Sequence, residues 1–165
     1  MVEQGLKISV DWKSNIKYLD NNFDNLISNY ESLKKKSIIY PEYYEKPFHA
    51  YDEGNLCWQA AMEVESAALT VHAPIFTSNN NELDINGDFL LRDNFHKNVI
   101  DIFKESNFSP KRILDIGCST GLSTVKLHSS FPKAEIIGID LSPYMLSGLI
   151  YYLFSFMLFG YLITY

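Results

Sequence analysis

Apolar positions near the start of the chain recur at alternating spacings of four and three residues, from Trp12 to Leu33. This spacing places the apolar side chains on one stripe of a helix, so it predicts a single amphipathic helix over residues 12–36. The same spacing would suit a coiled-coil seam. The run is short, however, and this favours a helix packed on its own domain.

Two more helices are expected before residue 109. Asn55 can cap a helix over residues 55–69, and residues 89–105 place apolar side chains on one face. An aromatic loop over residues 40–55 precedes the first of these helices, and a polar linker over residues 77–88 separates the two. We therefore expect residues 1–109 to form a helical N-terminal region.

Residues 110–141 show a different pattern of apolar residues from the helical region before them. Residues 112–116 and 134–140 are short, nearly continuous apolar runs, which are typical of parallel strands covered on both faces. Residues 122–130 between them form a helical pattern. Strand, helix and parallel strand make one right-handed crossover, which predicts an α/β fold.

The charge and the cysteine content of the chain limit the kinds of partner it can bind and the cellular compartment expected for it. The net charge of −6 and the pI near 5.1 argue against affinity for nucleic acid or for an anionic membrane surface, because both need clustered cations. Cys57 and Cys118 show no ligand spacing, so neither a disulfide framework nor a metal site is expected. The chain begins without a signal or transit peptide pattern, and the cytoplasm is the expected compartment.

The crossover carries groups suited to a nucleoside ligand. Glycines 117 and 121 let the backbone approach a ligand closely, at the carboxyl end of the first strand where ligands bind in open α/β sheets. Asp140 follows the second strand, 19 residues after Gly121, and can accept both hydroxyls of a ribose. A dinucleotide fingerprint would need glycine at positions 119 and 122, which hold serine and leucine.

The run Leu-Asp-Ile-Gly-Cys-Ser-Thr-Gly at residues 114–121 resembles motif I of the class I S-adenosylmethionine-dependent methyltransferases. The resemblance implies that Asp115 helps to position the methionine end of S-adenosylmethionine and that Asp140 holds the ribose. Ser119 stands where many family members carry glycine. The residues expected to bind the cofactor are Asp115, Gly117, Cys118, Ser119, Gly121 and Asp140. No catalytic residue and no metal ligand is nominated.

The resemblance extends over residues 40–146 to a plant and cyanobacterial methyltransferase-like group. By this analogy His49, Tyr51, Asp52 and Glu53 could line the substrate side, although packing of the loop explains the same residues and is favoured. The methyl acceptor would be a small molecule or a protein. Neither it nor the oligomeric state follows from the sequence.

The last segment, residues 147–165, holds no charged residue. Residues 149–165 suit a short transmembrane helix, a helix that covers an incomplete sheet, or a non-native read-through, and the last is favoured. We therefore expect an α/β fold with an N-terminal helical cap (1–109), an incomplete Rossmann-like core (110–146) with only the first β-α-β unit, and a hydrophobic C-terminal helix (147–165).

The resemblance also implies that much of the family's site is missing. We therefore expect weak or no cofactor binding and an inactive chain. The alternative function is a membrane-tethered, non-catalytic binding protein.

Overall fold

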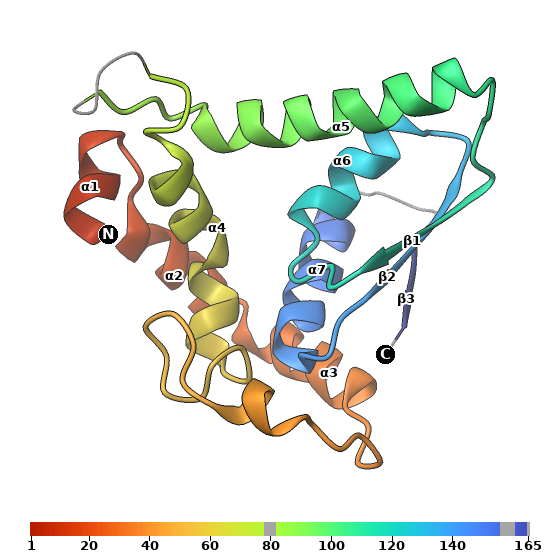
Figure 1. The fold of residues 1–165 in the computed structure, drawn as a ribbon. Coiled ribbons are helices and arrows are strands. Elements are labelled where there is room, and N and C mark those ends of the chain that lie inside the picture. Colours follow the sequence, from red (N-terminus) through yellow and green to blue (C-terminus); the bar gives the residue numbers. More distant parts are fainter. Residues whose placement is uncertain (78–81, 156–160, 165) are drawn as a thin grey trace.

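The structure, a computed structural model, describes residues 1–77, 82–155 and 161–164 (Figure 1). Helices come first along the chain and a small sheet with its own helices follows. The elements are α1 (Val2–Lys7), α2 (Trp12–Asp20), α3 (Phe23–Leu33), the 3₁₀ helix η1 (Glu42–Glu45), α4 (Trp58–His72), α5 (Gly87–Glu105), β1 (Arg112–Ile116), α6 (Leu122–Ser130), β2 (Glu135–Ile139), α7 (Pro143–Ser155) and β3 (Tyr161–Thr164).

The apolar stripe over residues 12–36 forms two helices, so the expected single helix is wrong. Asp11 caps α2 by accepting a hydrogen bond from the Ser14 N–H at 3.0 Å. Asn21 and Asn22 separate α2 from α3, and the Asn22 side chain donates to the Tyr18 carbonyl at 2.8 Å. Such bonds compete with the helical ladder, and asparagine has low helix propensity, so the helix breaks there.

The next two helices form close to their predicted positions. α4 begins at Trp58, because the Cys57 side chain and not Asn55 caps it, with Sγ accepting from the Ala60 N–H at 3.4 Å. The expected cap at Asn55 is therefore wrong. Residues just before Cys57 are held in a turn, in which the Leu56 N–H donates to the Glu53 carbonyl at 3.1 Å.

The predicted crossover is present. β1 and β2 pair in parallel with Leu114 opposite Ile137, and α6 connects them. A third strand, β3, pairs in parallel on the other side of β2 and gives the order β1-β2-β3. The expectation of only one β-α-β unit is therefore wrong, because the chain returns through α7 to add a strand. β2 has a neighbour on each side, whereas the outer edge of β1 pairs with no strand of the described residues.

Helices cover one face of this sheet. α6 and α7 lie on the same side of the strands in Figure 1, where Ile136 is completely buried. The side chains of Leu114 and Ile116 on β1 are 54% and 74% exposed. The prediction of strands covered on both faces therefore holds for one face only among the described residues.

The hydrophobic tail does not continue as one helix to its end. α7 stops at Ser155 and residues 161–164 form β3, while residues 156–160 and 165 of the expected helix lie outside the described residues. Ser147 and Leu149 are fully buried, and the Ser147 hydroxyl donates to the Leu26 carbonyl on α3 at 2.5 Å. Within the described ranges, no helix combines the length and the hydropathy that crossing a bilayer requires.

Two sets of contacts join the N-terminal helices to the sheet. The rings of Tyr30, Trp58 and Tyr144 pack together at the junction of α3, α4 and α7, with centroids 4.7 to 5.5 Å apart. α5 runs from α4 across to α6 (Figure 1). There Lys126 on α6 forms an ion pair of 2.6 Å with Asp93 on α5. The helical region is thus packed against the helices that follow β1 and β2.

Candidate functional site

The turn after β1 folds tightly against the end of β2. The N–H groups of Gly117 and Cys118 both donate to the Ile139 carbonyl, at 2.8 and 3.0 Å. Gly117 and Gly121 have φ values of 77° and 81°, which glycine adopts without strain. A Cβ on Gly117 would meet no atom within 4 Å, so the backbone of the turn faces open space there. A ligand can approach the peptide closely at this point.

Asp140 is bound to the same turn. The backbone N–H of Ser119 donates to Asp140 Oδ2 at 2.8 Å, and that of Ser142 donates to Oδ1 at 2.8 Å. The Tyr44 hydroxyl on η1 reaches Oδ1 over a longer 3.4 Å. Burial, together with the Asp140 charge, raises the pKa of Tyr44, so this hydroxyl stays protonated and donates. Asp140 thus connects β2, the glycine turn and the N-terminal region.

Ser119 adopts a backbone conformation that favours glycine, with a φ of 53°. Its N–H bond to Asp140 and a 3.5 Å contact from its Oγ to Met145 Sδ accompany this conformation. Many members of the family that this segment resembles have glycine at this position. Glycine suits the position because only glycine adopts a positive φ without cost.

The side chains of Asp115 and Cys118 make other contacts than those of Asp140. Asp115 Oδ2 accepts from the Thr124 hydroxyl at 2.6 Å and so anchors α6 to the end of β1. The Cys118 side chain is 5% exposed and belongs to a core cluster with Leu146 and Leu149. Burial raises the pKa of its thiol to about 12. The Cys118 side chain therefore lies in the core, and its backbone N–H is the group that takes part in the turn.

A cavity of about 330 Å³ opens beside the turn. Ser119 and Met145 line it from the sheet side, and His49 and Tyr51 line it from the aromatic loop. Small apolar side chains of α4 form another wall: Ala60, Val64, Ala67, Ala68 and Val71. Of the four loop residues considered for the substrate side, His49 and Tyr51 border this cavity and Asp52 and Glu53 do not.

The same cavity has a lining residue that sequence reasoning missed. His72, in the last turn of α4, borders it, and its Nδ1 lies 2.7 Å from Asp88 Oδ1 on α5. His72 and Asp88 are 16 residues apart and lie on two helices joined by a polar linker. No motif spacing connects them, so the pair becomes visible only when the helices are packed.

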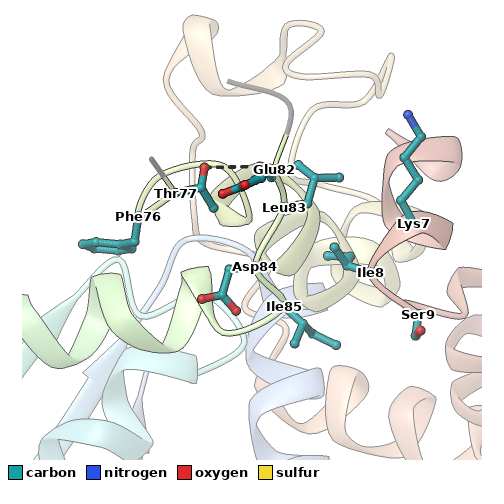
Figure 2. A pocket seen from close by; sticks show the side chains of 9 residues that line it. All are labelled: Lys7, Ile8, Ser9, Phe76, Thr77, Glu82, Leu83, Asp84 and Ile85. Carbon is teal, nitrogen blue, oxygen red and sulfur yellow. Dashed lines mark hydrogen bonds between the residues drawn. The ribbon is translucent and has the colours of Figure 1, made fainter. Parts of the chain in front are cut away.

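A wider cavity of about 640 Å³ lies elsewhere, between the end of α1 and residues 76–77 and 82–85 (Figure 2). Its described lining contains Lys7, Asp84 and Glu82, and Figure 2 shows Lys7 pointing away from the other side chains. None of the residues expected to bind the cofactor borders it. Size alone therefore does not identify the site.

Comparisons with known proteins match the segment that builds the turn. Residues 113–149 match a methyltransferase domain family. A 37-residue stretch is 49% identical to malonyl-[acyl-carrier protein] O-methyltransferase of Anoxybacillus flavithermus, covering 22% of this chain and 14% of that protein. Forty residues are 47% identical to trans-aconitate 2-methyltransferase of Methylobacterium radiotolerans, covering 24% and 15%. The same enzyme of Yersinia pestis is 51% identical over 40 residues, covering 24% and 16%.

This chain therefore spans about 14% to 16% of the length of these curated relatives. The match ends at residue 149, and so includes the buried Ser147 and Leu149. Residues 113–149 are therefore similar to part of a methyltransferase domain, and this part includes the glycine turn and Asp140.

Proposed function

We propose that this chain belongs to an enzyme that transfers a methyl group from S-adenosylmethionine to an acceptor held in the 330 Å³ cavity. The observation that carries the proposal is the juxtaposition of Ser119 and Asp140. Their 2.8 Å hydrogen bond joins the glycine turn to the acid after β2, and Ser119 also lines the cavity. Ligands of open α/β sheets bind at this edge, outside the carboxyl ends of the strands.

The residues present fit the cofactor. Asp140 would accept the ribose hydroxyls, and the open space at Gly117 would let the ligand approach the backbone. Asp115, held by Thr124, would support the methionine end through the turn. The helical region 1–109 would act as the cap, because the aromatic loop and α4 complete the cavity.

When bound, S-adenosylmethionine supplies a methyl group on a positively charged sulfur, whose bond to the methyl carbon breaks as the acceptor bond forms. The protein's task is then to align the acceptor's nucleophile with the methyl carbon and to exclude water. The apolar α4 wall serves both purposes. The cavity volume suits a small molecule or a single side chain of a protein substrate, since small-molecule sites begin near 300 Å³.

We also propose that the chain binds S-adenosylmethionine weakly. Both oxygens of Asp140 already accept hydrogen bonds from the turn and from Ser142. The Tyr44 hydroxyl occupies a further direction around Oδ1. Ribose hydroxyls would have to displace Tyr44, and the exchange of one hydrogen bond for another leaves little net free energy.

Isothermal titration with S-adenosylmethionine and with its demethylated product, S-adenosylhomocysteine, tests the proposal. We expect dissociation constants of about a millimolar, weakened roughly tenfold by Asp140→Ala. Asp101→Asn is the matched control, because that carboxylate lies on α5 in a loose 3.8 Å pair with Lys104. Micromolar binding would contradict the weak-binding proposal, and no binding of either compound at any concentration would contradict the cofactor assignment.

A further inference from the structure

His72 is held in one orientation by a series of hydrogen bonds. Its Nδ1 lies 2.7 Å from Asp88 Oδ1, and Arg92 Nε donates to the other oxygen of Asp88 at 2.9 Å. Arg92 Nη1 then donates to the Ser123 hydroxyl at 2.6 Å. Ser123 lies in α6, directly after the glycine turn. Hydrogen bonds through Asp88 and Arg92 thus connect the imidazole of His72 to the helix that follows the glycine turn.

This arrangement leaves Nε2 as the second ring nitrogen of His72, a residue that borders the cavity. With Nδ1 engaged by a carboxylate, the imidazole presents Nε2 as its remaining polar atom. His72 and Ser119 border the same cavity, one from α4 and the other from the turn. A histidine oriented by a carboxylate is the arrangement in which Nε2 accepts a proton, because the carboxylate stabilises the imidazolium that forms.

Asp88 is suited to that role because it stays ionised. Its residue is 9% exposed, and this burial acts to raise the pKa of the carboxyl. Hydrogen bonds from Arg92 and His72 outweigh burial, so the pKa of Asp88 lies below its usual range. Other residues with titratable groups that line the cavity are Met1, which precedes α1, and His49 and Tyr51 on the aromatic loop. Tyr51 donates its hydroxyl to Glu63 Oε2 at 2.8 Å.

The lining also restricts what the cavity can hold. The described residues that line this cavity include no lysine, arginine, aspartate or glutamate. Alanine, valine and methionine side chains dominate the walls, and the rings of Phe48 and Tyr51 add flat apolar surface. A compact, largely apolar acceptor fits such walls better than a molecule with several charges, because buried charges need partners.

We propose that His72 accepts the proton of the methyl acceptor, and that the acceptor is a small, largely apolar molecule with a weakly acidic hydroxyl group. The acceptor's O–H bond breaks, the proton bonds to Nε2, and the electron pair stays on the oxygen. That oxygen would then bond the methyl carbon, while the sulfur of S-adenosylmethionine would keep the electron pair of the carbon–sulfur bond that breaks. Asp88, which also pairs with Arg92, stabilises the imidazolium through its Oδ1, 2.7 Å from Nδ1. This inference rests on the proposed methyl transfer, and it assigns both a catalytic residue and an acceptor class.

The test uses 4-nitrophenol as the probe, because its anion absorbs visible light and reports proton loss directly. The full chain is mixed with the probe below the pKa of the free phenol. We expect the bound probe to be ionised, and the ionised fraction to fall about tenfold in His72→Gln and about threefold in Asp88→Asn. His128→Gln on α6 is the matched control, since His128 does not border the cavity. It should leave the signal unchanged.

Two further measurements keep the test decisive if a variant unfolds. The first is nitrogen NMR of the unmutated chain, which detects the protonation of His72 Nε2 as the probe is added. The second is probe binding to Ala67→Trp, which should be abolished because the larger side chain fills the cavity. Bound probe that stays protonated, or an ionised signal that survives His72→Gln in a folded protein, overturns the inference. Absence of probe binding also overturns it.

S-adenosylhomocysteine is titrated into the same samples to separate the two proposals. Binding of this compound without His72-dependent ionisation refutes the inference and leaves the cofactor proposal standing. His72-dependent ionisation without such binding refutes the cofactor proposal.

Discussion

The side chain of Leu149 occupies the space in which a Cβ on Gly121 would lie. Leu149 is fully buried in α7, and its Cδ1 is the first atom that such a Cβ would meet. Its Cδ2 also lies 3.7 Å from the corresponding position at Gly138 on β2. Gly121 therefore serves two purposes, because it adopts a positive φ in the turn and leaves room for the helix that follows β2. Gly138 on β2 also leaves room for Leu149.

Gly121→Ala should destabilise the fold more than Gly117→Ala. Both glycines have positive φ, so each alanine costs about 1 to 2 kcal/mol in backbone strain. At Gly121 the new methyl group also meets Leu149, which adds about 1 to 3 kcal/mol of overpacking, whereas Gly117 faces open space. Urea denaturation measures the difference. Equal losses in the two variants would show that Leu149 does not fill this space.

Leu149→Ala should lower the free energy of unfolding by about 2 to 5 kcal/mol, because it leaves a cavity against the turn. Leu114→Ala on the bare face of β1 is the control, and we expect a loss below about 1 kcal/mol for a side chain that is 54% exposed. Thermal or urea unfolding of the two variants gives the comparison. Similar small losses in both would mean that residues after 146 are not part of the packed core.

Asp88 should make stability depend on pH in the acid range. Its pKa in the folded protein is depressed, so its contribution is present above the unfolded pKa of about 3.9 and is lost as pH falls through the lower folded pKa. Asp88→Asn should therefore cost about 2 kcal/mol near neutral pH and should flatten the acid limb of the stability curve. Urea denaturation over a series of pH values measures this. Asp101→Asn, which breaks a loose surface pair of 3.8 Å, should change neither quantity by more than about 0.5 kcal/mol.

The two cysteines should differ in reactivity. Burial raises the pKa of the Cys118 thiol to about 12, so almost no thiolate forms near neutral pH. Cys57 is only partly buried. Iodoacetamide should label Cys57 in the folded protein and Cys118 only after unfolding, as read by peptide mass spectrometry. Rapid labelling of Cys118 in the native state would show that the turn opens away from α7.

Local sequence was most informative where near neighbours decide the structure. The apolar run at residues 112–116, the helix at 122–130 and the strand near 135–139 all formed where the pattern placed them. The stripe from Trp12 to Leu33 marked which side chains are apolar, but it did not reveal the break at Asn21 and Asn22. There a side-chain hydrogen bond to the Tyr18 carbonyl competes with the ladder, and a periodic count of apolar residues does not detect it.

Residues 114–121 and Asp140 by themselves carried the resemblance to methyltransferases, because the glycine turn and the strand ends are properties of a short stretch of chain. Only the tertiary structure decided that the tail adds a third strand after α7, and that His72 shares a cavity with Ser119. It also paired His72 with Asp88 on a neighbouring helix. These relationships depend on which helix faces pack together. Contact across packed faces is set by the whole core, and no local spacing encodes it.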